Sequence, residues 1–281
     1  MYTTVVDPRT LCEHLNDPAW VVIDCRSDLA HPDAGQAAYA RGHIPGAFYA
    51  SLEGVLTGAK TGRNGRHPLP EAEHFARFLR QAGVGEQTQV VAYDGGGDMY
   101  AARLWFLARW LGHEATAILD GGYAAWIEAG YPVSTETPAP RSTMAPIGAR
   151  IRPETTAKAG EIMAALGSSR QLVLDARSPD RFAGQNETID PVAGHIPGAR
   201  NRYFKENYDA RGRMKPPEQL RAEFAAAGIT VPQQVVHQCG SGISACVNLL
   251  AMEHAGLRGS QLYPGSWSEW ISDPSRPIAR Q

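Results

Sequence analysis

A cysteine followed by a loop rich in glycine and serine is the part of this sequence best suited to chemistry. Cys239 begins the run Cys-Gly-Ser-Gly-Ile-Ser, which ends at Ser244. Two glycines in so short a loop let the backbone curl, so that successive N–H groups can point inward and hold an anion. A thiolate is the form of cysteine that attacks an electrophile. We therefore expect Cys239 to act as a nucleophile within an anion-binding loop.

The segments on either side of the loop predict how the cysteine is positioned. Residues 234–237 form a short apolar run typical of a buried strand, and residues 245–255 have the spacing of a helix with one buried face. Cys239 would then lie at a strand-to-helix corner, where the partial positive charge of the helix N-terminus favours a thiolate. The other residues expected to line this binding loop are Gly240, Ser241, Gly242, Ile243 and Ser244.

A cysteine-based phosphatase is one alternative for a cysteine in such a loop. Those enzymes close a related loop with an arginine six residues after the cysteine, and this position is Ala245 here. The loop is also short for a phosphate group. It suits a smaller electrophile, such as the outer sulfur atom of a donor molecule.

Composition narrows the possible partners. The chain has 281 residues, of which 43% are hydrophobic, enough for two domains with a core each. Because 27 basic residues nearly balance 29 acidic ones, we expect neither nucleic acid nor an anionic membrane as a partner, but a small-molecule substrate. There is no run of eighteen apolar residues, and the N-terminal residues lack the pattern of a signal peptide, so we expect a cytoplasmic protein.

The four cysteines predict neither a metal site nor a disulfide framework. None of them stands in a Cys-x-x-Cys motif or beside a pair of histidines. We therefore expect no zinc site. Covalent catalysis by a cysteine nucleophile also needs no metal ion and no organic cofactor, so we expect neither. Cys12, Cys25 and Cys246 are expected to be packing residues.

The chain contains an internal repeat with an offset of about 150 residues. Residues 21–27 (VVIDCRS) recur as residues 172–178 (LVLDARS), and Gly-His-Ile-Pro-Gly-Ala occurs at 42–47 and at 194–199. A proline-rich stretch separates the two copies. We expect the domains to span 1–137 and 154–281, joined by a linker at 138–153.

Within each copy, short apolar runs alternate with helical patterns, which is typical of parallel strands joined by crossover helices. We therefore expect an α/β fold in which each domain is a parallel sheet with helices on both faces. Ligands of such sheets bind outside the carboxyl ends of the strands, where Cys239 is expected. The expected strands are 21–25, 90–93, 116–119, 172–175, 234–237 and 260–263, and the expected helices include 71–82, 100–111, 217–227 and 245–255.

The loop sequence CGSGISA resembles the active-site loop of the mercaptopyruvate sulfurtransferases, which are tandem-domain members of the rhodanese superfamily. The two repeated motifs are similar to rhodanese signature elements, and the resemblance covers nearly the whole chain. It implies a catalytic second domain and an inactive first one, in which Asp94 replaces the cysteine. The motif histidine occurs in both copies, as His43 and as His195. We therefore interpret both as structural residues that bind loop backbone.

The resemblance also implies two partners for the cysteine. His67, in Gly-Arg-His-Pro-Leu-Pro, matches the H-x-L-P histidine of those enzymes, which lies beside the catalytic loop. With Cys239 and Ser241 it would form a Cys-His-Ser arrangement that moves protons on the nucleophile and the donor. Those relatives orient the histidine with an upstream aspartate, and here Glu53 is the candidate for this role.

Arg181 is similar to an arginine in a family R-F-x-G motif that binds anionic donors, and its planar guanidinium suits a carboxylate. A second family arginine is missing from residues 185–191, so we expect another residue, such as Arg103 of the first domain, to complete the binding of the carboxylate. Thiosulfate-specific relatives carry basic residues just after the cysteine, where this chain has Gly240 and Ser241. This favours mercaptopyruvate as the donor.

The resemblance implies a two-step sulfur transfer. Sulfur would move from 3-mercaptopyruvate to Cys239 as a persulfide, and then to cyanide or to a thiol acceptor such as thioredoxin or a small dithiol. Two alternatives stay open. One is a thiosulfate:cyanide sulfurtransferase, and the other is a sulfur-carrying or binding module without turnover.

Overall fold

The computed structural model describes residues 1–97, 99–141 and 145–280, and these form two compact units. Unit 1 comprises Met1–Gly58, Leu69–Arg152 and Tyr208–Met214, and unit 2 comprises Ala59–Pro68, Pro153–Asn207 and Lys215–Gln281. Most of each unit is one copy of the sequence repeat. Two short segments, 59–68 and 208–214, belong to the unit built by the other copy.

Unit 1 contains a parallel sheet with the strand order β1-β5-β4-β2-β3. Side chains alternate between the faces of a strand, so register decides which residues share a face. The strands are β1 (Val5–Val6), β2 (Trp20–Asp24), β3 (Phe48–Tyr49), β4 (Gln89–Tyr93) and β5 (Thr116–Leu119). The helices are α1 (Pro8–Glu13), α2 (Ala34–Arg41), α3 (Ala72–Gln81), α4 (Tyr100–Trp110) and α5 (Gly122–Glu128).

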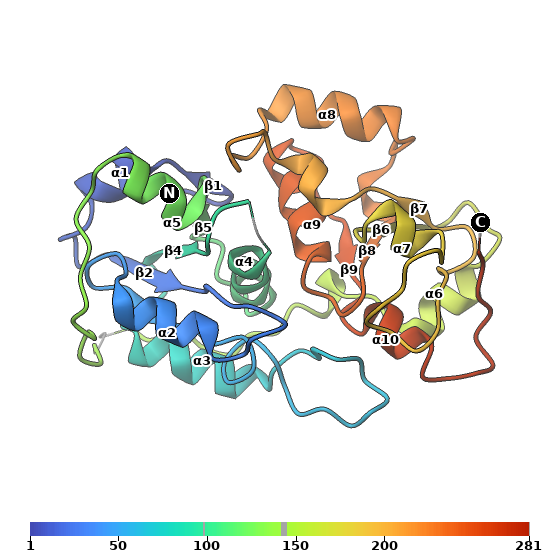
Figure 1. Cartoon of the computed structure of the whole chain (residues 1–281), viewed down its shortest axis with the longest axis horizontal. Coiled ribbons are helices and arrows are strands. Elements are labelled where there is room, and N and C mark those ends of the chain that lie inside the picture. The colour runs from blue at the N-terminus through green and yellow to red at the C-terminus, as the bar shows by residue number, and fades with distance from the viewer. Residues whose placement is uncertain (98, 142–144, 281) are drawn as a thin grey trace. The chain divides into compact units, whose positions relative to one another are not determined.

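Helices cover both faces of the unit 1 sheet. Val22 and Val91 are paired across β2 and β4, and they pack in one core cluster with Leu11 of α1 and Trp126 of α5. Figure 1 shows α1 and α5 above these strands and α3 below them. The sheet is therefore buried on both sides, as a parallel sheet requires.

Unit 2 repeats this plan with a four-stranded parallel sheet of order β7-β6-β8-β9. Its strands are β6 (Leu172–Asp175), β7 (Arg200–Asn201), β8 (Val235–Gln238) and β9 (Gln261–Leu262). Its α-helices are α6 (Ala159–Ala165), α7 (Pro179–Phe182), α8 (Pro217–Ala226), α9 (Ala245–His254) and α10 (Ser266–Trp270). Three short 3-10 helices span Pro153–Thr155, Phe204–Asn207 and Pro232–Gln234.

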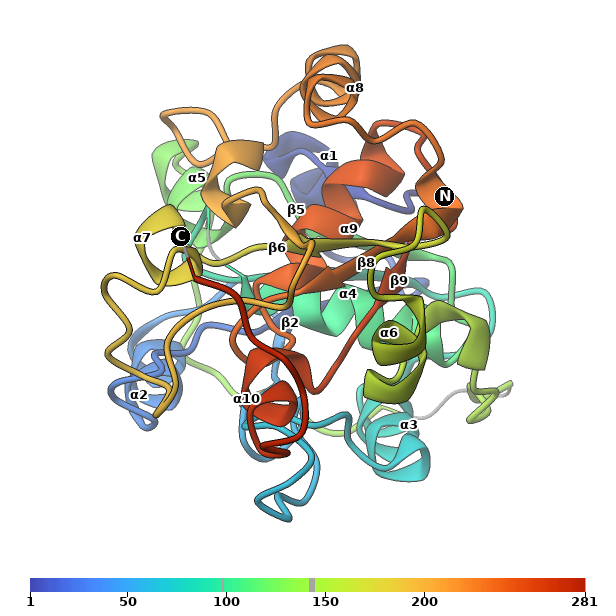
Figure 2. The same ribbon diagram turned by 90° about the vertical axis from the view of Figure 1, so that its right-hand side faces the viewer.

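The two faces of the unit 2 sheet carry different helices. Ile162 of α6 and both tryptophans of α10, Trp267 and Trp270, pack in one cluster with Val173 and Val236 of the sheet. Figures 1 and 2 show α8 and α9 on the opposite side of β8 from α6 and α10. The carboxyl end of β8, where Cys239 follows, thus lies between two packed helical layers.

The predicted α/β class and parallel sheets are confirmed, and the longer predicted strands and helices agree with the structure to within one or two residues. One expectation about α9 is wrong. Residues 245–252 are all buried, so the helix has no exposed face over these two turns. The reason is that α9 packs against β8 and β9 and also against α8 and the 3-10 helix at 204–207.

The histidines of the repeated motif bind backbone, as predicted, but the carbonyl at each Nδ1 belongs to a helix, α2 or α7, and not to a loop. His43 Nδ1 lies 2.8 Å from the carbonyl oxygen of Tyr39, and His195 Nδ1 lies 2.8 Å from that of Phe182. Both rings are buried, and each stacks on the aromatic ring of its partner at a centroid distance of 3.9 Å. Each histidine therefore fixes the loop that follows a helix of its own unit.

Candidate active site

Cys239 directly follows β8, and α10 holds its backbone in place. The N–H of Cys239 donates to Ser266 Oγ at 3.1 Å, and its carbonyl accepts from the N–H of Trp267 at 3.0 Å. The side chain turns into the loop, where the N–H of Gly242 donates to Sγ at 3.1 Å. Only 2% of the residue is exposed. The predicted loop, in which a backbone amide points at the sulfur, is therefore present.

Gly242 is needed for this geometry. Its φ is +78°, and a Cβ atom there would lie 2.2 Å from the carbonyl oxygen of Pro264. Both facts exclude a side chain, because non-glycine residues avoid this conformation and no heavy atom tolerates that distance. Ile243 and Ser244, the last loop residues before α9, are buried.

His67 and Ser241 meet, as predicted. Nδ1 of His67 lies 2.8 Å from Oγ of Ser241, and both residues are buried, with 6% and 5% exposed. The histidine belongs to segment 59–68, which is part of unit 2. This segment approaches α10 closely, because a Cβ on Gly65 would lie 2.6 Å from the carbonyl oxygen of Gly265. Glu53, the candidate for orienting the ring, is an exposed residue of unit 1, and its role stays a prediction.

Two guanidinium groups lie over Gly240, the residue after Cys239. A Cβ atom at this glycine would be 2.8 Å from Nη2 of Arg66 and 3.4 Å from Nη2 of Arg181. Arg181, which was expected to bind the donor, thus lies beside the loop, and its role in donor binding stays a prediction. Arg66 was not identified from the sequence, although it precedes His67 in the same loop. Its backbone N–H donates to Ser268 Oγ at 3.0 Å, which fixes it to α10.

These arginines end a chain of alternating charges, which we call the ionic chain. It begins with Asp175 and Arg177, whose Oδ2 and Nη2 are 2.7 Å apart, and continues through Glu187, 3.5 Å from Arg177 and 2.9 Å from Arg181. Asp190 then pairs with Arg181 at 3.2 Å and with Arg66. In order, the six residues are Asp175, Arg177, Glu187, Arg181, Asp190 and Arg66.

Burial and charge shift the pKa values along this chain in different directions. Burial raises the pKa of Asp190, and the arginines only partly offset this effect. Burial also acts to raise the pKa of Glu187, but its hydrogen bonds from Arg181 and from the backbone lower it overall. Although burial opposes it, the carboxylates of Asp175 and Glu187 raise the pKa of Arg177. Glu187 is therefore held as a carboxylate more firmly than Asp190.

In unit 1, the position that matches Cys239 is filled by a carboxylate. Asp94 is buried, and it accepts hydrogen bonds from the N–H groups of Gly96 at 3.1 Å and Ala101 at 3.0 Å. Since burial raises the pKa of Asp94, these N–H groups oppose the cost of its charge. The amides that could hold an anion in this loop thus hold the protein's own side chain.

Arg103, the other arginine expected to bind the donor, belongs to α4 of unit 1. It is fully buried, and its Nε donates to the carbonyl oxygen of Leu56 at 3.3 Å. Its proposed contribution to donor binding stays a prediction.

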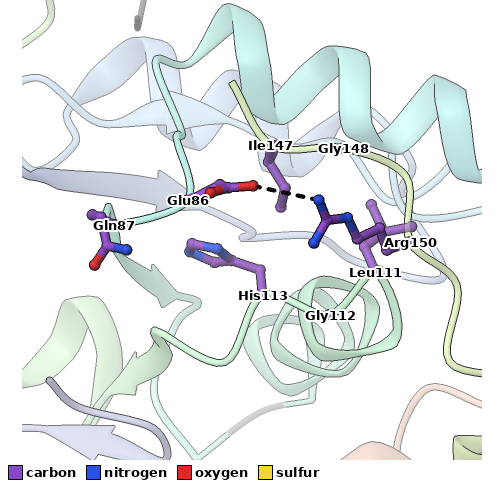
Figure 3. A pocket seen from close by; sticks show the side chains of 8 residues that line it. All are labelled: Glu86, Gln87, Leu111, Gly112, His113, Ile147, Gly148 and Arg150. Atoms are coloured by element: carbon purple, nitrogen blue, oxygen red, sulfur yellow. Dashed lines mark ion pairs between the residues drawn. The ribbon is translucent and has the colours of Figure 1, made fainter. Parts of the chain in front are cut away.

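A separate hollow of about 270 Å³ lies in unit 1 (Figure 3). Across it, Glu86 and Arg150 form an ion pair at 3.8 Å, and the buried ring of His113 has its pKa lowered by burial. The lining contains no cysteine, serine or threonine, so it offers no thiol or hydroxyl nucleophile like that of the Cys239 loop. Its residues are Glu86, Gln87, Leu111, Gly112, His113, Ile147, Gly148 and Arg150.

The described residues contain no group of three or more His, Cys, Asp and Glu side chains that could hold a metal ion. Among the same residues, no helix has the length and apolar character needed to span a membrane.

Comparison with known proteins places the site in a family. Residues 7–129 and 158–273 match the rhodanese-like domain. A Pseudomonas aeruginosa protein named "Probable 3-mercaptopyruvate sulfurtransferase" is 43% identical over 96% of both chains, and a thiosulfate sulfurtransferase of Cricetulus griseus is 30% identical over 96% of this chain and 93% of its own. The structure of 3-mercaptopyruvate sulfurtransferase from Leishmania major superposes with a TM-score of 0.84 at 30% identity, covering 98% of this chain and 75% of that one.

Proposed function

Because this chain belongs to the rhodanese-like domain family, we propose that it is a sulfurtransferase that takes sulfur from 3-mercaptopyruvate onto Cys239. The single observation that carries the proposal is the hydrogen bond from the Gly242 N–H to Cys239 Sγ, in a loop whose Ser241 also contacts His67. A buried sulfur that accepts a backbone N–H is prepared to carry negative charge. Ser241 of the proposed proton-moving pair lies in the same loop, and His67 reaches it from segment 59–68.

In the first step, the Cys239 thiolate attacks the thiol sulfur of mercaptopyruvate. An S–S bond forms, the C–S bond breaks, and its electron pair stays on the carbon as the enolate of pyruvate. A proton then moves to this carbon, so that a thiol and mercaptopyruvate become a persulfide and pyruvate. The His67–Ser241 pair supplies or removes protons at the sulfur and at the leaving enolate.

In the second step, an acceptor thiolate attacks the outer sulfur of the persulfide. The S–S bond to Cys239 breaks, its electron pair returns to Cys239, and the acceptor leaves as a persulfide. Cyanide accepts the sulfur in the same way and becomes thiocyanate. We propose a small dithiol or a thioredoxin-like dithiol as the acceptor, and the cytoplasm as the compartment, because none of the four cysteines forms a disulfide.

The charges near the cysteine favour mercaptopyruvate as the donor. Gly240 and Ser241, the two residues after Cys239, carry no charge, while Arg66 and Arg181 supply planar guanidinium groups over Gly240. Two such groups suit the single carboxylate of mercaptopyruvate. The same two guanidinium groups also favour thiosulfate as a second candidate donor.

A steady-state comparison of the two donors, with cyanide and with dithiothreitol as acceptors, tests the proposal. We expect a higher kcat/KM for mercaptopyruvate, and Ser241→Lys should narrow the difference, because it places a cation beside a dianionic donor. One charged contact there should change the ratio about ten- to a hundredfold. A higher kcat/KM for thiosulfate in the unmodified protein would replace the proposed donor by the second candidate.

A further inference from the structure

The outer half of the ionic chain lies in unit 2, where Arg66 of segment 59–68 joins residues of the second repeat. Its inner pair, Asp175 and Arg177, has a counterpart in unit 1, where Asp24 and Arg26 are 2.6 Å apart. Each arginine also donates to the carbonyl oxygen of the glycine that begins the Gly-His-Ile-Pro motif. The aspartate–arginine pair therefore has a structural role, because it also occurs in unit 1, which has no cysteine at the matching position. The outer residues, from Glu187 to Arg66, are the part that distinguishes the site.

Within the outer half, Asp190 is the carboxylate recorded beside Gly240, next to the two arginines. Its Oδ2 is 3.7 Å from the position of a Cβ on Gly240, and its carboxylate contacts both Arg66 and Arg181. Only 1% of this side chain is exposed, compared with 32% of Arg66 and 18% of Arg181. An anion that reaches the two guanidinium groups therefore comes within a few ångströms of a buried carboxylate.

The charges of the ionic chain cancel when all groups are ionised, since three carboxylates face three guanidinium groups. The arginines thus offer no surplus positive charge to a bound donor. A monoanion adds one uncompensated charge, and a dianion adds two. Interactions between charges are stronger in a partly desolvated site than in water. The Asp190 carboxylate therefore repels the second negative charge of a dianion more strongly than it would in water.

We propose that Asp190 is a specificity-determining residue that makes the site select sulfur donors by charge, favouring monoanions over dianions. The inference rests on the proposed sulfur transfer at Cys239, and it names the basis on which that site chooses its donor. It also explains how two arginines next to a cysteine can serve a carboxylate donor without equally favouring thiosulfate.

Two donors of similar chemistry but different charge test the proposal. Thiosulfate is a dianion and methanethiosulfonate is a monoanion, and both present an outer sulfur bonded to a sulfonyl group. Their ratio of kcat/KM is compared in the full-length protein, in Asp190→Asn and in Asp190→Glu. Asp273→Asn is a matched control, because this aspartate also faces an arginine, Arg276 at 3.6 Å, but its side chain is 45% exposed.

We expect Asp190→Asn to raise the thiosulfate-to-methanethiosulfonate ratio about ten- to a hundredfold. The ratio should stay within about twofold in Asp273→Asn and in Asp190→Glu, which keeps the charge. If Asp190→Asn changes both donors by the same factor, or if Asp190→Glu shifts the ratio as much, Asp190 only orients the arginines and the proposal is overturned.

The comparison of thiosulfate with methanethiosulfonate does not use mercaptopyruvate. Charge selection by Asp190 and mercaptopyruvate as the donor can therefore be disproved separately. If Asp190→Asn shifts the ratio but mercaptopyruvate is a poor donor, the charge selection stands and the proposed donor falls. If Asp190→Asn does not fold, the proposal is tested with the unmodified protein. There, methanethiosulfonate should exceed thiosulfate by a larger factor than it does in the reaction with free cysteine, and an equal factor would overturn the proposal.

Discussion

Nδ1 of His67 lies 2.8 Å from Oγ of Ser241, although 174 residues separate them in the sequence. The contact exists because segment 59–68 leaves the fold of its own repeat and packs in unit 2. A hydrogen bond between two buried side chains fixes both rotamers at low cost, since neither group has to be taken from water again during the reaction. The pair that we propose to move protons is thus already arranged in the structure without a donor.

Removing the imidazole should therefore reduce turnover rather than folding. We expect His67→Ala to lower kcat with mercaptopyruvate by about 10²–10⁴, and the double variant with Ser241→Ala to lower it little further, because the two side chains act as one unit. The exposed residue His31 provides the control, since His31→Ala should keep full activity. Independent, multiplicative losses in the double variant would show that the pair does not act together.

Gly242 should tolerate no side chain. Its positive φ alone costs alanine about 1–2 kcal/mol, and the contact with the Pro264 carbonyl adds to this cost. We expect Gly242→Ala to lower the free energy of unfolding by at least about 2 kcal/mol and to abolish persulfide formation. In Gly160→Ala, where no atom lies within 4 Å of the new Cβ and the residue is in α6, stability should rise by about 0.5–1 kcal/mol. Equal stability of Gly242→Ala and the unmodified protein would contradict this account of the loop.

His237, in the middle of β8, should make the protein sensitive to acid. Burial lowers its pKa from 6.5 to about 3. The unfolded chain therefore takes up a proton near pH 6.5 while the folded chain does not, so stability is lost as the pH falls from about 6.5 toward 3. Between pH 7 and pH 4.5 this loss amounts to about 2–3 kcal/mol.

Urea unfolding of the unmodified protein and of His237→Gln at pH 7 and pH 4.5 measures this effect. Glutamine does not titrate, so the variant should lose about 2–3 kcal/mol less than the unmodified protein between the two pH values. The same loss in both proteins would show that other groups cause the acid sensitivity.

The strands and helices that could be predicted are those whose own sequence has a clear hydrophobic pattern. The apolar runs at β2, β4, β5, β6 and β8 read as strands because each is buried on both faces in a parallel sheet. Of the two-residue strands, β9 was predicted within residues 260–263, whereas β1, β3 and β7 were not identified, because two residues have too little periodicity to mark a strand reliably. Their pairing depends on the neighbouring strand rather than on their own sequence.

The site residues also divide into those that the local sequence identifies and those that only the packing of distant segments brings together. Cys239 and its loop are local in the sequence, and the resemblance identified His67, Ser241 and Arg181. The pair formed by Arg66 and Asp190 joins residues 124 positions apart, and it depends on how segment 59–68 packs on unit 2. No local pattern carries that information, so this half of the ionic chain became visible only in the structure.

The central claim is that Cys239 alone carries sulfur, and intact-mass measurement tests it most directly. The unmodified protein, Cys239→Ser and Cys246→Ser are each incubated with mercaptopyruvate. Excess donor is removed, and the intact mass is measured by mass spectrometry. Cys246 is the matched control, because it is also buried and lies one loop away, with its Sγ 3.4 Å from the carbonyl oxygen of Gly242. The account predicts one added sulfur atom, about 32 Da, in the unmodified protein and in Cys246→Ser, and none in Cys239→Ser. An added sulfur that persists in Cys239→Ser would contradict it.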